Sequence, residues 1–170
     1  MFGLLRSLTD IALLRKDPSG LPSSRASVAL FVLVYVAADF AVGRVGGIPQ
    51  VLQRTALDLA LTLPFFWLLL TLTRRAHRLP QTINAALGVY VLLSPIVAVL
   101  LLLRIPAMNN QGLGLFVTAG YVLFMIWYLL IVGHILRSAL DTGLVTGFAI
   151  AITWTVATIA VSQRVFGGAA

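Results

Sequence analysis

The chain has 170 residues, of which 60% are hydrophobic and only 10% are charged. Soluble domains are usually about 45–50% apolar and about 25% charged, so this composition excludes an ordinary soluble domain and a disordered chain. The formal net charge is +7, from 12 Lys and Arg residues against 5 acidic residues, all of them Asp. The basic residues form short clusters between apolar runs, as in membrane proteins, and do not indicate a nucleic-acid-binding domain. The composition therefore predicts a polytopic membrane protein.

Residues 1–25 are expected to form an amphipathic segment and a linker. Leu4, Leu8 and Ile11 recur at helical spacing, which predicts an amphipathic helix lying in the cytoplasmic interface. Arg6 and Asp10 interrupt the apolar run, so we do not expect a cleavable signal peptide. The sequence Asp-Pro-Ser-Gly at 17–20 then predicts a turn that ends the helix.

Residues 26–170 are expected to form a single transmembrane helical domain. A spanning helix needs about 20 largely apolar residues. Five segments meet this criterion, and the fold class predicted is an all-α polytopic bundle with spans at about 26–42, 51–73, 83–103, 113–136 and 143–161. The first segment is short and contains Asp39, so a four-span alternative places that segment in the interface. Pro64 and Pro95 are expected to kink the second and third spans.

The basic residues predict the orientation of the spans. In a five-span arrangement eight basic residues flank the side that carries the N-terminus: Arg6, Arg15, Lys16, Arg25, Arg74, Arg75, Arg78 and Arg137. Four flank the opposite side: Arg44, Arg54, Arg104 and Arg164. The positive-inside rule then predicts a bacterial inner-membrane protein with a cytoplasmic N-terminus and a periplasmic C-terminus.

Two aspartates inside apolar spans are the candidate functional residues. An acidic side chain at the bilayer centre costs roughly 2.5–3.5 kcal/mol, so Asp39 and Asp58 require a role. Arg54 and Asp58 are four residues apart on one helix face, and Arg44 follows Asp39 across the end of the first span. One interpretation is a pair of buried ion pairs that fix the packing of the first two spans. The other is a proton or cation relay.

Two further clusters of residues are candidate contact surfaces. Arg74, Arg75 and Arg78 form the densest basic patch, which is interpreted as a topology signal or as a site for lipid headgroups or a docking partner. Gly143, Gly147 and Ala151 are spaced by four residues, a small-residue face that permits close helix approach. We expect this face to serve internal packing rather than an oligomer contact.

Catalytic, metal and cofactor sites are not predicted. The chain has no cysteine, and it contains no H-E-x-x-H, P-loop or G-x-S-x-G pattern. Its two histidines are His77, in a basic loop, and His134, near the cytoplasmic end of the fourth span. Topology permits both to face one side, but His134 is expected to contact a backbone group or a headgroup instead of a metal or haem.

One family resemblance is noted. Three segments resemble an uncharacterised group of proteobacterial inner-membrane proteins. They are Leu13-Leu14-Arg15-Lys16-Asp17-Pro18 before the five spans, Gln81-Thr82-Ile83-Asn84 after a basic loop, and Gly133-His134-Ile135-Leu136-Arg137 at the end of the fourth span. That group is similar in layout to the Yip-domain membrane proteins. The resemblance implies a role in interaction or membrane organisation and no catalytic residue.

The sequence therefore predicts a non-enzymatic accessory or assembly subunit of a membrane. Its expected partners are the lipid bilayer and another integral membrane protein or a second copy of the chain, and no nucleic acid. The alternatives are a small proton- or cation-coupled transporter that uses Asp39 and Asp58, and a cofactor-binding electron-transfer subunit that uses His134.

Overall fold

The computed structural model describes residues 2–167, and within this range it contains helices and no strand. The long helices are α1 (Phe2–Ala12), α2 (Arg25–Val45), α3 (Val51–Leu72), α4 (Leu79–Ala107), α5 (Gln111–Leu140) and α6 (Leu144–Phe166), with two 3-10 turns, η1 (Pro18–Gly20) and η2 (Ala76–Arg78). Helices α2 to α6 are long and apolar enough to cross a membrane. The predicted all-α bundle with five candidate spans is confirmed.

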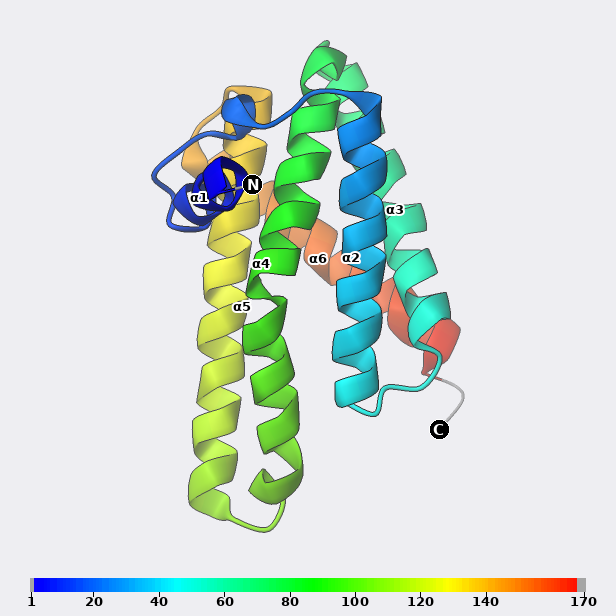
Figure 1. Cartoon of the computed structure of the whole chain (residues 1–170), viewed down its shortest axis with the longest axis vertical. Helices are drawn as coiled ribbons and strands as arrows, with labels where there is room; N and C mark the ends of the chain where they lie inside the picture. The colour runs from blue at the N-terminus through cyan, green and yellow to red at the C-terminus, as the bar shows by residue number, and fades with distance from the viewer. Residues whose placement is uncertain (1, 168–170) are drawn as a thin grey trace.

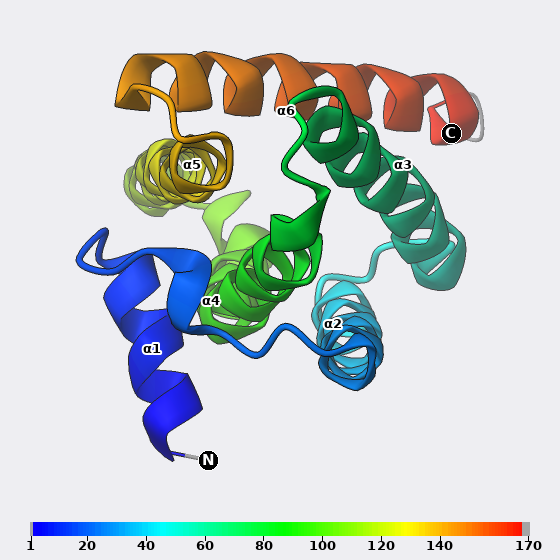
Figure 2. The same cartoon turned by 90° about the horizontal axis from the view of Figure 1, so that it is seen from above.

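Helix α4 lies at the centre of the bundle. Viewed from above, α1, α5, α3 and α2 surround it (Figure 2), and all four contact it. Helix α6 crosses the far side of the bundle obliquely (Figure 1) and packs mainly on α5. Helices α1, α2, α3 and α5 therefore all pack on α4.

The middle helices are longer than hydropathy predicts. Helix α4 has 29 residues and α5 has 30, against the roughly 20 that a bilayer requires. Their hairpin extends past the loop between α2 and α3 (Figure 1). Helix α4 changes direction near its middle (Figure 1), and Pro95 lies in the middle of its sequence range. Helix α2 also exceeds its predicted bounds and has 21 residues, so the first apolar segment is a full-length helix.

The N-terminal helix packs on the bundle through its apolar side. Helix α1 lies crosswise to the long axis of α4 and α5 (Figures 1 and 2). Leu8 and Ile11 are buried there, so the side of α1 expected to face the membrane interface faces protein. A Cβ at Gly88 would lie 2.7 Å from Leu8 and 2.6 Å from Phe31, so the glycine lets side chains of α1 and α2 meet on α4. The helix ends at Ala12, before the turn that the Asp-Pro-Ser-Gly sequence predicts.

Candidate functional site

Both intramembrane aspartates are partly buried and hydrogen-bonded to hydroxyl groups. On α3, Oδ2 of Asp58 accepts a hydrogen bond of 2.5 Å from the Tyr35 hydroxyl on α2. On α2, Oδ2 of Asp39 accepts one of 2.5 Å from Thr55 on α3, and its Oδ1 accepts one from Tyr90 on α4. We call these five residues, Tyr35, Asp39, Thr55, Asp58 and Tyr90, the acid–hydroxyl cluster. It joins three helices that are separate in sequence.

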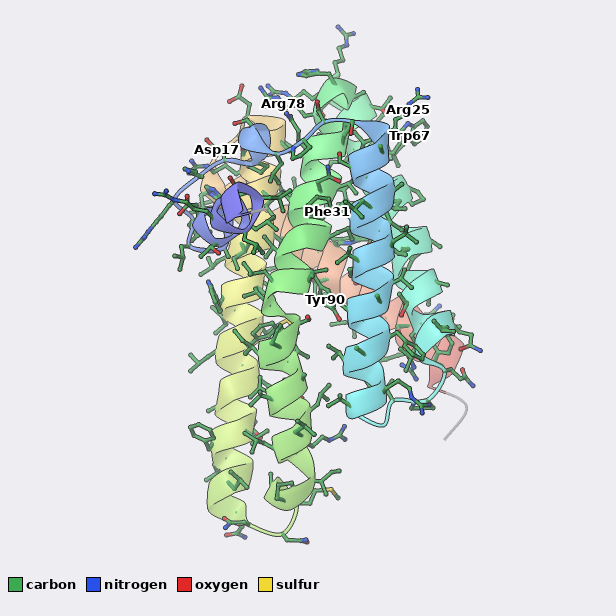
Figure 3. The ribbon with its side chains drawn as sticks, viewed as in Figure 1. Asp17, Arg25, Phe31, Trp67, Arg78 and Tyr90 are labelled. Carbon is green, nitrogen blue, oxygen red and sulfur yellow. The ribbon has the colours of Figure 1, made fainter. Side chains whose placement is uncertain are left out.

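The cluster lies well inside the bundle. Figure 3 places Tyr90 about half-way along the bundle, between α4 and α2. The rings of Tyr35 and Tyr90 are tilted against each other with centroids 4.8 Å apart. Thr55 is buried, and its hydroxyl also lies 2.9 Å from the carbonyl oxygen of Val51. The contact between the two rings thus links the partner of Asp58, which is Tyr35, to a partner of Asp39, which is Tyr90.

The arginines predicted to pair with these aspartates lie elsewhere. Arg54 Nε donates a 3.2 Å hydrogen bond to the Pro49 carbonyl oxygen, and the Arg54 guanidinium lies 4.7 Å from the centroid of the Phe166 ring. Arg44 is exposed. Among residues 2–167, no Lys or Arg nitrogen lies within 4.0 Å of a carboxylate oxygen of Asp39 or Asp58. The predicted ion pairs are therefore replaced by hydroxyl partners, because the carboxylates face neighbouring helices and the arginines reach the helix ends.

Asp58 also borders three cavities. One, of about 220 Å³, extends to Arg54 and Ser162 at the ends of α3 and α6. Two others, of about 340 and 130 Å³, lie between α2, α3, α4, α5 and α6, and Tyr35, Tyr90 and Tyr128 line both. The buried hydroxyl oxygen of Tyr121, which lines the larger of these two, has no hydrogen-bond partner within residues 2–167. Threonine hydroxyls add to the lining: Thr62, Thr155 and Thr158.

The basic patch is partly used within the protein. Arg75 forms an ion pair of 3.1 Å with Asp141, and Nη1 of Arg78 donates a 2.7 Å hydrogen bond to the Ser138 carbonyl oxygen. Both contacts attach the start of α4 to the end of α5. Arg74 is exposed and has a positive φ of 58°. Two of the three arginines thus hold the bundle together at the positions where the sequence suggested a docking surface.

The small residues of α6 face α5. A Cβ at Gly147 would lie 2.3 Å from the Gly133 carbonyl oxygen and 2.8 Å from the Arg137 backbone nitrogen. Ala151 is completely buried. Gly143 precedes the helix as its N-cap, and a Cβ there would meet nothing within 4 Å. Gly147 and Ala151 therefore serve internal packing, and Gly143 is not part of that contact.

The two histidines lie in different environments. His77 is exposed, whereas His134 is buried and its Nε2 lies 3.1 Å from the Lys16 carbonyl oxygen. The Trp127 Nε1 donates a 3.1 Å hydrogen bond to the Ala12 carbonyl oxygen. Helix α5 thus holds the end of α1 and the following linker through two ring nitrogens. Among residues 2–167, no group of three or more His or Asp side chains has the placement of a metal site.

Sequence reasoning missed the three hydroxyl residues of the cluster. A signal was present, because Tyr35 is four residues before Asp39 and Thr55 is three before Asp58, so each shares a helix face with an acid. Tyr90 gives no such signal, since its partner Asp39 is 51 residues away.

Comparison of the chain with protein-family models, with curated proteins and with solved structures finds no match. The resemblance to proteobacterial inner-membrane proteins of Yip-like layout stays a prediction.

Proposed function

We propose that the protein is a non-enzymatic multi-pass membrane protein that binds and passes a proton or another small monovalent cation at Asp58 and Asp39. The observation that supports this is the position of Asp58, whose carboxylate is held by the Tyr35 hydroxyl and borders a cavity that extends to Arg54 and Ser162. This cavity connects Arg54, near the start of α3, with an acid inside the bundle, where a bound cation would neutralise the carboxylate.

The charge of the cluster gives the physical argument. An isolated carboxylate within the apolar region is unfavourable, so it is neutralised by a basic side chain, a proton or a bound cation. No basic side chain does this for either acid within residues 2–167. Hydroxyls donate to a carboxylate and accept from a carboxylic acid, so Tyr35 and Tyr90 can serve both states.

The test is ion flux in proteoliposomes that contain the purified chain. Under an imposed pH gradient, the wild type should dissipate the gradient, and Asp58→Asn should lower the flux at least tenfold while the protein still folds. Asp10→Asn, at a carboxylate of α1 outside the spans, is the matched control and should retain the flux. Replacing Na⁺ by a large organic cation distinguishes a proton from Na⁺ as the moving ion. Wild-type flux equal to that of empty liposomes under all gradients would exclude the proposal.

The proposed location is a bacterial inner membrane with the N-terminus in the cytoplasm. The support is the distribution of charge. Eight basic residues belong to the N-terminal segment, the start of α2, the loop between α3 and α4 and the last turn of α5, against four at the opposite helix ends.

An accessory role in a membrane complex is the second candidate. It is favoured by the α4–α5 hairpin, whose end extends past α2 and α3 (Figure 1) and carries exposed apolar side chains, among them Leu102, Ile105, Met108, Leu115 and Phe116. Purification from the native membrane under mild conditions tests it, since a subunit should bring its partner in fixed stoichiometry. The absorption spectrum of the same preparation tests the electron-transfer alternative, which requires a bound chromophore.

A further inference from the structure

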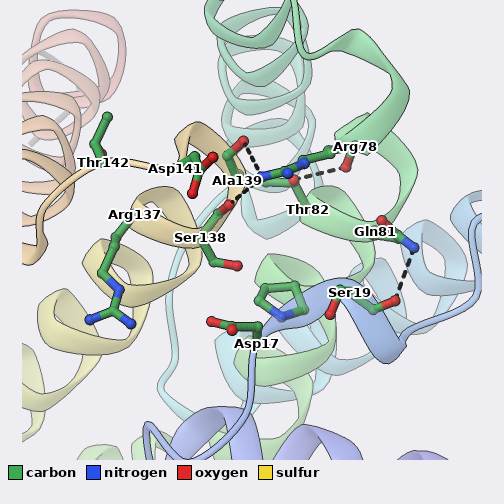
Figure 4. Close-up of a pocket in the computed structure, with 11 residues that line it drawn as sticks. Asp17, Ser19, Arg78, Gln81, Thr82, Arg137, Ser138, Ala139, Asp141 and Thr142 are labelled. Carbon is green, nitrogen blue, oxygen red and sulfur yellow. Dashed lines mark hydrogen bonds between the residues drawn. The ribbon is translucent and has the colours of Figure 1, made fainter.

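A polar cavity lies at the end of the bundle where α4 begins and α5 ends, away from the acid–hydroxyl cluster. Its volume is about 400 Å³, and its walls are Asp17 with the start of η1, the junction of η2 and α4, and the last turn of α5 with the residues that follow it. Figure 4 shows Asp17 and Ser19 on one side of it, Arg78, Gln81 and Thr82 on another, and Arg137 to Thr142 on a third. No residue of the proposed cation route takes part in this lining.

Some of the charged side chains that line the cavity have partners within the protein, and others do not. Arg78 is fixed by its hydrogen bonds to the carbonyl oxygens of Ser138 and Ala139, and Asp141 is neutralised by Arg75. The half-buried side chain of Arg137 forms no hydrogen bond or ion pair within residues 2–167. The guanidinium donors of Arg137 are therefore free to bind an anionic group that enters the cavity.

Asp17 supplies the opposite charge. Its side chain is 53% exposed, and in the described part of the chain the basic group within 4.0 Å of it is the His134 ring, at 3.8 Å. No Lys or Arg nitrogen in that part of the chain lies within 4.0 Å of its carboxylate. The cavity thus presents one unengaged guanidinium and one carboxylate that no arginine or lysine neutralises, on different walls.

The position of the cavity indicates the source of a ligand. It lies among the ends of the membrane-crossing helices, beside the arginines of the basic patch, which is the depth of lipid headgroups. Leu144 and Val145 follow the lining residue Thr142 and are exposed, at 42% and 83%, so acyl chains have an apolar surface next to the cavity. A soluble phosphate would gain nothing from this surface.

We propose that the cavity binds the headgroup of a zwitterionic phospholipid, with the phosphodiester on Arg137 and a primary ammonium on Asp17. A guanidinium matches two phosphate oxygens with parallel N–H donors. A carboxylate accepts N–H donors of a primary ammonium, whereas it repels a purely anionic headgroup and finds no N–H on a trimethylated one. The pair Arg137 and Asp17 therefore selects phosphatidylethanolamine over phosphatidylglycerol and phosphatidylcholine of the same acyl chains.

The test is retention of lipid by the delipidated, purified chain, measured by native mass spectrometry after addition of each of the three lipids. Wild-type protein should retain phosphatidylethanolamine about tenfold better than the other two, the effect expected of one charge-assisted hydrogen bond. Arg137→Gln should lower the retention of all three lipids, because each contains the phosphodiester. Asp17→Asn should remove only the preference for the ethanolamine lipid and leave the phosphatidylglycerol signal unchanged or raised.

Two controls and one competitor complete the experiment. Arg164→Gln and Asp10→Asn make the same chemical changes away from the cavity and should behave as wild type. Arg137→Lys keeps the charge, so it should recover part of the binding if Arg137→Gln is well folded; if Arg137→Gln does not fold, the Asp17→Asn result decides. Equal retention of the three lipids by the wild type, or an unchanged preference in Asp17→Asn, overturns the proposal. Full displacement of lipid by millimolar inorganic phosphate also overturns it, because the ligand would then be free phosphate.

Discussion

Gly147 of α6 lies against Gly133 of α5 so closely that a Cβ at residue 147 would be 2.3 Å from the Gly133 carbonyl oxygen. At Gly133 a Cβ would be 2.9 Å from the Cα of Phe148 on α6. The atoms in the way are backbone atoms, which cannot move aside as a side-chain end does. The two glycines thus set the separation of α5 and α6, and α6 depends mainly on this contact because it packs little on α4.

Gly147→Ala should therefore destabilise the folded protein by at least about 1–3 kcal/mol, the usual cost of overpacking. The change would be favourable by about 1 kcal/mol in an unpacked helix, since alanine is the better helix former. Gly143→Ala is the matched control, because its Cβ meets nothing within 4 Å, and it should cost less than about 1 kcal/mol. Unfolding in mixed micelles measures both, and equal stability of the two variants would contradict this account of the α5–α6 contact.

The number of membrane-spanning helices and the bounds of α3 were predictable from the sequence, and the lengths of α4 and α5 were not. Apolar runs of about 20 residues identify the spans, because the bilayer requires that length. The ends depend on local polar contacts that hydropathy ignores. Helix α5 begins where the Asn110 side chain accepts a hydrogen bond from the Leu113 backbone, and it ends at Asp141, whose φ of 54° is left-handed. Arg104 and Arg137 thus lie inside helices that the hydropathy pattern ends before them.

A double-mutant cycle tests the partner of Asp58. Tyr35→Phe and Asp58→Asn should be coupled by about 0.5–2 kcal/mol in the free energy of unfolding, the range found for hydrogen bonds between membrane helices. Arg54→Gln and Asp58→Asn should be coupled by less than about 0.5 kcal/mol, because Arg54 contacts Pro49 and Phe166 instead. A larger coupling of Asp58 to Arg54 than to Tyr35 would contradict this assignment and support the ion pair that the sequence predicts.

Only part of the candidate site could be predicted from the sequence. The acids were identifiable because a carboxylate in an apolar span needs a stabilising partner. The spacing also places Tyr35 and Thr55 on the same helix faces as the acids, but it does not show that each hydroxyl bonds the acid of the other helix. Tyr90 reaches Asp39 only through the packing of α4 on α2, which no local pattern encodes.

The orientation of the spans can be tested with single cysteines, since the chain has none. Ser23→Cys and His77→Cys should be protected from a membrane-impermeant maleimide in intact cells and react after permeabilisation. Asn109→Cys and Gln163→Cys should react in intact cells. All four positions are exposed, so accessibility within the protein does not limit the reaction. If Ser23 and Gln163 report the same side, four segments cross and the five-span topology is wrong.

The ion pair between Asp10 of α1 and Lys16 of the following linker makes the stability of the protein depend on pH. Lys16 Nζ lies 2.8 Å from Asp10 Oδ2, and this hydrogen bond lowers the pKa of the Asp10 carboxyl below its ordinary value. Since the folded-state pKa is lowered, the stabilisation is present above the pKa of the unfolded chain and is lost as the pH falls through the folded-state pKa. An NMR titration of the Asp10 carboxyl should show a lowered midpoint that Lys16→Gln raises. Arg25→Gln should leave the midpoint unchanged; if it moves the midpoint as far as Lys16→Gln does, the ion pair is not the cause.

The attachment of α1 to the bundle depends in part on the hydrogen bond from Trp127 to the Ala12 carbonyl oxygen. Ala12 is buried, so removing the donor leaves a carbonyl group without a partner, at a cost of about 1 kcal/mol or more. Trp127→Phe keeps an aromatic ring on α5 but removes the N–H, and it should raise the population in which α1 is detached about fivefold.

Limited digestion with trypsin measures this population, because cleavage after Arg15 or Lys16 requires the linker to leave the surface of α5, where the His134 ring lies 3.1 Å from the Lys16 carbonyl oxygen. Trp67→Phe makes the same change at a side chain that is 55% exposed, and it should leave the cleavage rate at that of the wild type. Equal rates for Trp127→Phe and Trp67→Phe would show that the apolar contacts of Leu8 and Ile11 hold α1 without help from the tryptophan.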